Sequence, residues 1–206
     1  MKHEWRKHEK ELYVPKAKPV ALTVPAMKFF TVAGQGNPND SAFAPFIEVL
    51  YALSYRVRMS PKQGDAPDGY FDYTVYPLEG VWDITDEAKA RFTGTVDTDD
   101  LVFKLMIRQP DFVTAAYALE TIEKVKAKKG LALLDRVKFE SIEEGAAVQM
   151  LHVGPFEEEP ATFAVMESFA AAAGLTRKSK IHREIYLSDT RRVAPEKLKT
   201  VLRFGV

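Results

Sequence analysis

Cysteine is absent from the 206-residue chain, and this absence excludes several kinds of chemistry. The protein cannot form disulfides, use a thiolate nucleophile or bind a metal through sulfur, and its composition suits a reducing cytoplasm. No apolar run approaches the roughly 20 residues that a membrane-spanning helix needs. The N-terminal stretch MKHEWRKHEKELY is charged and lacks the apolar centre of a signal peptide. We therefore expect a cytoplasmic protein without a membrane partner, beginning with a solvated arm or a short helix.

The chain also lacks an excess of charge of either sign, with 29 basic and 29 acidic side chains. Binding of nucleic acid favours a basic surface, and imitation of DNA requires a strongly negative one, so neither role is expected. Known catalytic and cofactor motifs are missing as well. There is no HExxH motif, P-loop or GxSxG elbow, and GQGNP is an incomplete dinucleotide fingerprint. We predict neither a metal nor another cofactor.

What the sequence does contain is a repeated order of elements. A strand, a Gly-containing loop, a helix and two strands occur at about 26–108 and again at about 146–206. The helices of the two halves are expected at about 41–59 and 157–174, from apolar residues at helical spacing. Between the halves, a further helix is expected at about 112–129 with Asp111 as its cap. After it, two strands joined at EEG are expected to form a hairpin.

This order predicts an α+β fold with internal pseudosymmetry, a mostly antiparallel sheet and helices on one face. No linker-like stretch separates the halves, so we expect one domain over 20–206 after a charged arm at 1–19. Module one should span about 20–110 and module two about 138–206, with a linking helix at about 111–130. The sheet face without helices would then be available for a ligand cleft.

The stretch KIHREIYLSDTRR contains the strongest candidate residue. In the strand expected at 181–187, His182, Glu184 and Tyr186 share one face because side chains alternate along a strand. The opposite face carries mainly Ile and Leu side chains and should pack against helices. Glu184 then belongs either to a solvated strand face or to a ligand site in which the carboxylate is functional.

A second aromatic stretch favours the ligand site. YFDYTVYPLEGVW is expected to form a strand at 70–76 that corresponds to the one carrying Glu184, and Tyr76 would then be the counterpart of Tyr186. Glu79 and Trp82 follow it. Aromatic walls with a carboxylate suit a planar, cationic or electrophilic guest. Met106 could line the same cleft. Tyr55 could too, although a tyrosine at helical spacing is more often a core or rim residue.

Three motifs carry a family resemblance. HREIYLSD, HVGPFEEEPATFAVMESF and YTVYPLEGVW resemble the GyrI-like small-molecule-binding family, over most of the chain from about residue 20. The resemblance is closest to a stand-alone bacterial subgroup, whose motifs also match PLEGVW, MIRQPDF and APEKLKTVLRF. It implies a pair of SHS2 modules, each a strand, a helix and two strands, around a central ligand cleft. This agrees with the repeat found in the sequence.

The resemblance also implies roles for individual residues. In related effector domains of multidrug-responsive activators, a Glu on the penultimate strand meets aromatic cations, and Glu184 occupies the matching place, with Tyr186 two residues on. Other relatives resemble hydrolases that open cyclopropanoid DNA-alkylating compounds. We therefore expect Glu184 and Tyr186 to be catalytic, and His182, Tyr76, Trp82, Glu79, Tyr55 and Met106 to contact the ligand. No helix-turn-helix module is expected before the first strand.

Two main functions remain open from the sequence. In the first, the protein is a hydrolase in which Glu184 activates water and a tyrosine hydroxyl stabilises the developing negative charge. In the second, the same cleft binds drugs or metabolites without turnover, and Glu184 is the counter-ion of a cation. A third role, inhibition of a topoisomerase, is suggested only by the family name. The sequence indicates no oligomeric state.

Overall fold

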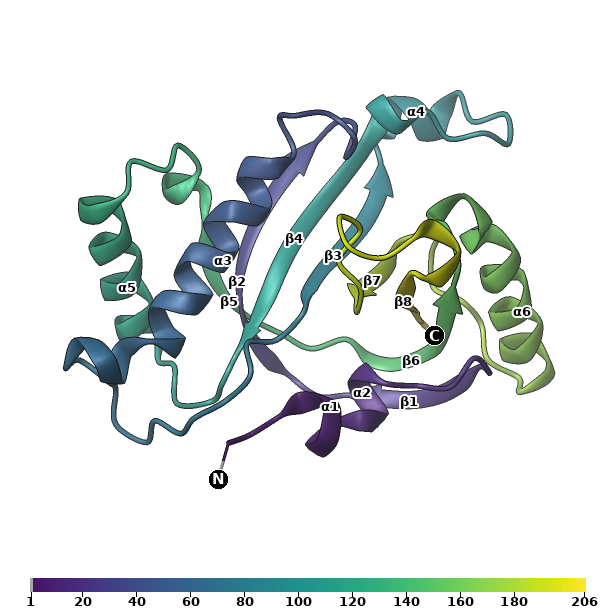
Figure 1. Cartoon of the computed structure of the whole chain (residues 1–206). Coiled ribbons are helices and arrows are strands. Elements are labelled where there is room, and N and C mark those ends of the chain that lie inside the picture. The colour runs from purple at the N-terminus through teal and green to yellow at the C-terminus, as the bar shows by residue number, and fades with distance from the viewer. Residues whose placement is uncertain (1) are drawn as a thin grey trace. The chain divides into compact units, whose positions relative to one another are not determined.

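The computed structural model describes residues 2–206 (Figure 1). The helices are α1 (Trp5–His8), α2 (Lys10–Tyr13), α3 (Ala44–Arg58), α4 (Asp86–Ala90), α5 (Ala115–Lys128) and α6 (Glu159–Ala172). The strands are β1 (Val20–Val24), β2 (Met27–Gln35), β3 (Leu78–Ile84), β4 (Leu101–Gln109), β5 (Lys138–Ile142), β6 (Gly145–Val153), β7 (His182–Tyr186) and β8 (Lys199–Gly205). The fold is α+β, as the sequence predicts, and β2-α3-β3-β4 and β6-α6-β7-β8 repeat one order of elements.

The chain divides into two compact units. The first consists chiefly of Met27–Leu78 and Trp82–Ile142, and the second of Glu4–Ala26, Glu79–Val81 and Glu143–Val206. Two boundaries differ from the sequence-based modules. Strand β1 pairs with β6 and so belongs to the second unit. The helix expected to link the modules, α5, packs on α3 within the first unit.

The first unit has the strand order β3-β4-β2-β5, with β2 antiparallel to both of its neighbours. Helix α3 lies against β2 and β4 and buries one stripe, which includes Leu50, Leu53 and Val57. The helix begins at Ala44, three residues later than expected, and has no side-chain cap. Helix α5 is capped by Thr114, whose hydroxyl accepts the backbone N–H of Tyr117, rather than by Asp111.

The strand predicted at 70–76 is wrong. This stretch holds a single bridge, from Tyr73 to His3, and β3 begins at Leu78, directly after Pro77. Proline cannot donate to a strand ladder, so the pairing starts only beyond it. Tyr73 is instead buried in an aromatic cluster that contains Tyr70, Phe71 and Phe112. The strand that corresponds to β7 in the repeat is therefore β3, and Tyr76 precedes it.

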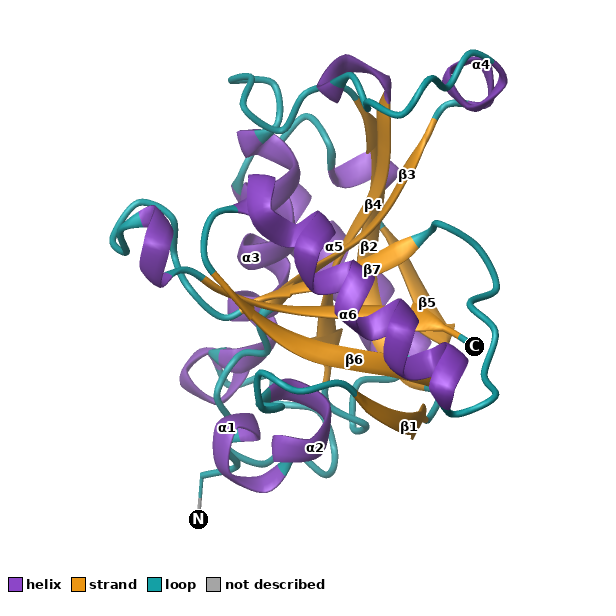
Figure 2. Cartoon of the chain, turned by 90° about the vertical axis from the view of Figure 1, so that its right-hand side faces the viewer, coloured by secondary structure: helices purple, strands orange, loops and turns teal. Residues whose placement is uncertain are grey.

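The second unit has the strand order β1-β6-β8-β7, all antiparallel where the register is defined. Helix α6 crosses β6, as Figure 2 shows, and closes a core over one sheet face. That core consists of Val148, Met166, Ala170, Leu202 and Phe204. The two strands predicted around EEG exist, but they do not form a hairpin: β5 pairs with β2, and β6 pairs with β1 and β8.

The N-terminal arm is folded rather than solvated. Helices α1 and α2 bury Trp5 and Tyr13, whose ring centroids lie 5.4 Å apart. The backbone carbonyls of Glu11 and Leu12 accept hydrogen bonds from Gln149 and Arg203 of the sheet. Within residues 2–206, no helix has both the length and the apolar character of a membrane-spanning segment.

The core under α6 should depend on Met166, which has no exposed surface. We expect Met166→Ala to lower the free energy of unfolding by about 2–5 kcal/mol, because it leaves a cavity. The neighbouring Val165, 49% exposed on the same helix, is the matched control. Val165→Ala should change stability by about 0.5 kcal/mol or less. Urea unfolding of both variants measures the difference, and equal effects would contradict this core.

Candidate functional site

Arg183 and Glu184 are adjacent on β7, and their side chains lie on opposite faces of the second unit's sheet. Glu184 lies opposite Leu202 of β8, which in turn lies opposite Met150 of β6, so Glu184 shares the face that α6 covers. Arg183 lies opposite Arg203, on the other face. The predicted grouping of His182, Glu184 and Tyr186 agrees with this register. The expectation that the opposite face packs under the helices is wrong, because α6 covers the face of Glu184.

Glu184 is buried, with 8% of its surface exposed, and it has two partners on its own strand. The Tyr186 hydroxyl donates to Glu184 Oε2 at 2.8 Å, and His182 Nε2 lies 3.1 Å from Oε1. Aromatic rings flank these partners: Phe163 of α6 meets the His182 ring edge-on at 4.8 Å, and Phe156 meets Tyr186 at 6.1 Å. The structure therefore brings together three residues that the sequence predicts for the site.

Glu159, the first residue of α6, joins this group and was not predicted. It is 7% exposed, and no hydrogen-bond partner within residues 2–206 reaches its Oε1. Burial raises the pKa of Glu159 to about 10, and the nearby charge of Glu184 acts in the same direction. The N-terminus of a helix favours an anion by only about 0.3–1 kcal/mol, whereas a second buried charge costs several. Glu159 is therefore neutral at pH 7.

These residues also offer donors that a metal ion could use. One atom each from Glu159, His182 and Glu184 lie within 4.8 Å of one another, and this is the one such group of three in the described part of the chain. Carboxylate oxygen and imidazole nitrogen are ordinary ligands of zinc and related ions. The alternative to a metal ion is a proton on one of the two carboxyl groups, which also reduces the negative charge at these atoms.

The opposite face carries a buried ionic network, which contains the predicted ligand residue Glu79. Arg183 Nη1 donates to Glu79 Oε2 at 2.6 Å, and its Nε lies 3.1 Å from Glu144 Oε1. Arg203 donates to Glu144 at 2.8 Å and also to Gln149. Glu79 has no exposed surface. Its position is that of a structural counter-ion, and contact with a ligand stays a prediction.

The other predicted ligand residues lie in the first unit. Tyr76 is buried under the Arg108 guanidinium, 4.6 Å from its ring centroid. Trp82 is buried between the rings of Phe43 and Phe103, and Met106 is fully buried in β4. Tyr55 is 53% exposed and stacks on Tyr51. Their contact with a ligand, and the cleft between the modules, stay predictions.

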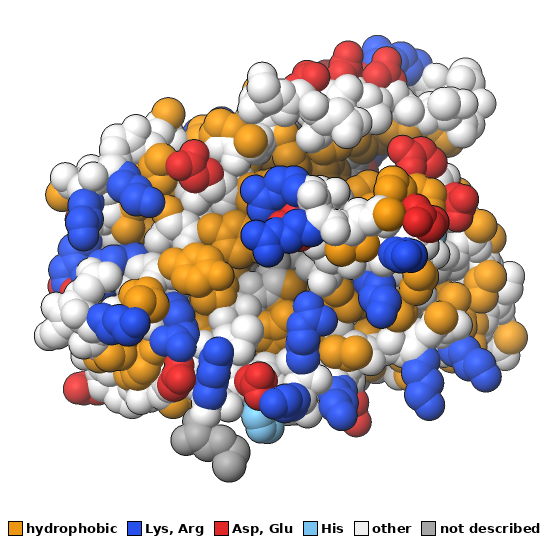
Figure 3. Space-filling view, viewed as in Figure 1, with side chains coloured by type: hydrophobic (Ala, Val, Ile, Leu, Met, Phe, Trp, Pro, Cys, Tyr) orange, Lys and Arg blue, Asp and Glu red, His pale blue; other side chains and the backbone are white. Residues whose placement is uncertain are grey.

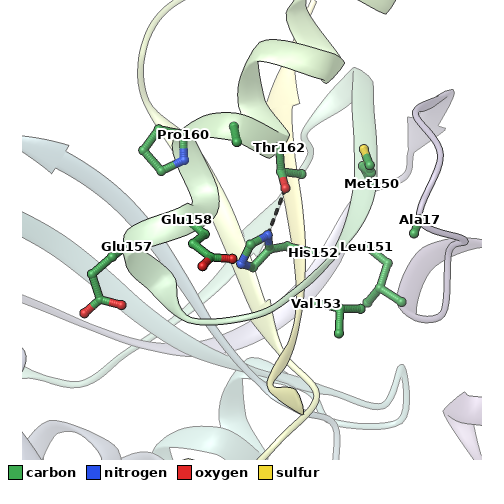
Figure 4. Close-up of a pocket in the computed structure, with 10 residues that line it drawn as sticks. Ala17, Met150, Leu151, His152, Val153, Glu157, Glu158, Pro160 and Thr162 are labelled. Carbon is green, nitrogen blue, oxygen red and sulfur yellow. Dashed lines mark hydrogen bonds between the residues drawn. The ribbon is translucent and has the colours of Figure 1, made fainter. Parts of the chain in front are cut away.

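A pocket of about 560 Å³ opens beside the start of α6 (Figure 4). Its lining residues are Ala17, Met150, Leu151, His152, Val153, Glu157, Glu158, Pro160, Ala161 and Thr162. His152 Nδ1 lies 2.8 Å from Thr162 Oγ1, and Nε2 lies 3.0 Å from the Pro155 carbonyl. Both ring nitrogens are thus used in fixing the loop before α6. The volume suits a small molecule.

Comparisons with known proteins agree with this fold. The family model of the GyrI-like small molecule binding domain matches residues 17–206. A hydrolase from Listeria innocua is 38% identical, with a TM-score of 0.87 and 98% of each chain covered. An uncharacterized conserved protein from the same organism is 40% identical, with the same TM-score and coverage. No match was found among curated proteins.

A more distant structure shares only the fold. The C-terminal domain of EcmrR is 12% identical, with a TM-score of 0.51 over 91% of this chain and 96% of that one. The fold and the family model together define a small-molecule-binding domain. The chain belongs to the GyrI-like family, which confirms the resemblance found in its motifs.

The face of the molecule in Figure 3 carries charges of both signs. Basic, acidic and hydrophobic side chains lie side by side on the face in Figure 3, as expected from the equal numbers of basic and acidic residues. Imitation of DNA would require a strongly negative surface.

The network on the Arg183 face yields a stability prediction. We expect Glu79→Ala to lower the free energy of unfolding by about 3–5 kcal/mol, because it removes a buried counter-ion and leaves Arg183 poorly compensated. Chemical denaturation measures this value. The exposed Glu196 is the control, and Glu196→Ala should have an effect within about 0.5 kcal/mol. A loss below about 1 kcal/mol for Glu79→Ala would show that the ion pair is not structural.

The burial of Glu159 predicts a substitution that stabilises the protein, in a way that depends on pH, whereas Glu79→Ala destabilises it. The pKa of Glu159 is about 10 in the folded protein and ordinarily 4.5, so the folded state alone holds this proton between those values. Its contribution to stability is complete below pH 4.5 and falls as the pH rises toward 10. Glu159→Gln removes this loss. We expect the variant to be more stable than the wild type by more than about 1 kcal/mol at pH 7 and not at pH 4. Urea unfolding at both pH values tests this, and an equal effect at each would contradict it.

Proposed function

We propose that this protein binds planar electrophilic small molecules at the Glu184 site and hydrolyses them, with cyclopropanoid DNA-alkylating compounds as the substrate class. The observation that carries the proposal is the environment of Glu184. It is a buried carboxylate whose hydrogen-bond partners include Tyr186 and His182 and, within the described residues, neither an arginine nor a lysine. Such a carboxylate keeps its negative charge available to a ligand or to water.

In the proposed reaction, Glu184 acts as general base. It accepts a proton from a water molecule as the water oxygen bonds to the strained ring carbon. The ring C–C bond breaks, and its electron pair moves through the conjugated system to the substrate carbonyl oxygen. The Tyr186 hydroxyl, which donates to Glu184 in the absence of substrate, turns its hydrogen to that oxygen as negative charge develops there. Glu184 then gives its proton to that oxygen. The product is the ring-opened alcohol with a phenolic hydroxyl, so one water is added overall. General-base assistance contributes about 10²–10⁴-fold and a positioned donor a similar factor.

Two further facts support an enzyme. The partners of the carboxyl group, His182 and Tyr186, are only half-buried, which leaves water a route to it. A similar chain from Listeria innocua, 38% identical with a TM-score of 0.90, is described as a hydrolase. For this chain we propose a detoxifying role in the cytoplasm, where a protein without cysteine is suited to reducing conditions.

The second candidate function is binding without turnover. One observation favours it: aromatic rings lie beside a carboxylate that has no cationic side chain as its hydrogen-bond partner in the described residues. This arrangement also suits an aromatic cation, which would stack on the rings and neutralise Glu184. The protein would then sequester or sense such compounds.

Glu184→Gln separates the two functions because the amide keeps the size of the side chain and removes the base. If the protein is a hydrolase, we expect kcat for a cyclopropanoid substrate to fall by about 10²–10⁴-fold. Affinity for the uncharged substrate should change only a few-fold. Product formation by mass spectrometry and binding by fluorescence measure the two quantities, with Glu196→Gln as the matched control. Stoichiometric binding by the wild type without any product would leave sequestration as the function.

A further inference from the structure

The imidazole of His182 lies between two hydrogen-bond acceptors. Its Nδ1 is 3.2 Å from the backbone carbonyl of Lys180, and its Nε2 is 3.1 Å from Glu184 Oε1. A neutral imidazole carries one hydrogen, so it donates to only one of these oxygens. When Nδ1 donates to the carbonyl, the Nε2 lone pair faces the carboxylate and both can bind one cation. Metal-binding histidines are held in this way, because a backbone carbonyl on one nitrogen orients the other toward the ion.

Glu159 brings a third ligand atom to the same place. One of its carboxyl oxygens lies within 4.8 Å of the ligand atoms of His182 and Glu184. The residue is only 7% exposed, and its Oε1 has no hydrogen-bond partner within residues 2–206. Its neighbours Glu184 and Glu157 add negative charge around it. A buried carboxyl oxygen without a donor needs an explanation, and a bound ion supplies one.

A proton serves this group of atoms less completely than a metal ion does. A proton between His182 Nε2 and Glu184 Oε1 joins those two atoms alone. A proton on Glu159 Oε1 finds no acceptor among the described residues. A metal ion instead binds all three side chains at once, and a carboxylate can bind it through one oxygen or both. The group is therefore better suited to an ion than to a proton.

The distances and charges suit a divalent transition metal. Zinc binds imidazole nitrogen and carboxylate oxygen at about 2.0–2.2 Å, so neighbouring ligand atoms lie roughly 3.4 Å apart around it. Nε2 of His182 and Oε1 of Glu184 are 3.1 Å apart. Two carboxylates supply the two negative charges that one divalent ion neutralises. An imidazole ligand favours zinc and related ions over magnesium and calcium, which prefer oxygen alone. The His182 side chain is 22% exposed, which gives an ion a route from solvent.

We propose that Glu159, His182 and Glu184 form a binding site for a divalent transition-metal ion of the zinc class, and that the bound ion stops Glu184 from acting as a base. The second part of this proposal rests on the proposed function. The ion takes the place of the proton that Glu159 holds without it, and that proton is released to solvent. Tyr186, which donates to Glu184 Oε2 at 2.8 Å, keeps the carboxylate oriented. A carboxylate bound to a metal ion is a weaker base toward water.

Local spacing does not register such a site. The sequence-based expectation of no metal depends on motifs in which the ligands are close together along the chain. Here one ligand comes from the start of α6 and two come from β7. The crossing of α6 over the sheet brings them together.

Calorimetry with Zn²⁺ on the chelator-treated protein tests the site without any substrate. We expect one ion per chain, and binding that is weaker by about tenfold or more in Glu159→Gln and in His182→Ala. The exposed Glu157 and His8 provide matched controls. Glu157→Gln and His8→Ala should bind Zn²⁺ within about threefold of the wild type. Urea unfolding verifies that both ligand variants are folded. A wild type that binds no zinc, or ligand variants that lose no more affinity than the controls, would overturn the proposal.

X-ray absorption at the zinc edge identifies the ligands directly. We expect imidazole nitrogen and carboxylate oxygen at about 2.0–2.2 Å, and no cysteine sulfur, since the chain has none. The imidazole signal should be lost in His182→Ala and persist in His8→Ala. A signal that persists in His182→Ala would place the ion elsewhere and contradict the site.

Turnover of a cyclopropanoid substrate tests the second part separately. Saturating Zn²⁺ should lower kcat of the wild type by about tenfold or more, and a chelator should restore it. Glu159→Gln should need about tenfold more zinc for the same inhibition, whereas His8→Ala should respond as the wild type does. An unchanged or raised kcat with one ion bound would overturn the inhibitory role.

Failure of the proposed function gives a different result. If the metal-free protein turns over no cyclopropanoid compound but binds one zinc ion through these ligands, hydrolysis fails and the metal site stands. Zn²⁺ should then weaken the binding of an aromatic cation, measured by fluorescence, because both positive charges use Glu184. An aromatic cation that binds equally well with and without zinc would show that the ion leaves Glu184 available, and would overturn the second part of the proposal.

Discussion

Arg183 and Glu184 are adjacent, oppositely charged and both buried, and the alternation of β7 prevents them from neutralising each other. Each charge needs its own compensation on its own face of the sheet. Arg183 lies among Glu79, Glu144 and Arg203. Glu184 lies under the start of α6 with Tyr186, His182 and Glu159. Much of the second unit, from the N-terminal helices to the first turn of α6, is arranged around these two requirements.

The two faces differ in how their charges balance. On the Arg183 face, two arginines meet two glutamates, so every charge has a partner and the network is structural. On the Glu184 face, two carboxyl groups meet a phenol and an imidazole, and within residues 2–206 Glu184 has neither a lysine nor an arginine as its hydrogen-bond partner. One proton removes one of the two negative charges, and the other is left. An incompletely balanced buried charge costs stability, so it is tolerated best where a ligand or a reaction uses it. This contrast separates Glu184 from Glu79, although both are buried glutamates near aromatic residues.

Much of the fold and part of the site follow from the sequence alone. The repeated order of elements and the grouping of His182, Glu184 and Tyr186 depend on local periodicity, which the sequence displays. Which face of β7 is covered depends on where α6 crosses the sheet, and local periodicity does not contain that information. The strand predicted at 70–76 failed because Pro77 moved the pairing to Leu78. Glu159 could have been found, since it lies four residues before Phe163 and seven before Met166 on the buried stripe.

The one negative charge of the carboxyl pair connects the two candidate functions. A bound aromatic cation and an attacking water molecule would both use the charge on Glu184. They cannot use it at the same time, because a carboxylate that neutralises a cation is a weaker base toward water. Hydrolysis therefore favours neutral electrophiles, because the strain of their own ring supplies the driving force for ring opening. Sequestration favours cations, which would occupy the same carboxylate without reacting. The charge of the guest, rather than its shape, would then decide whether a planar aromatic compound is turned over or held.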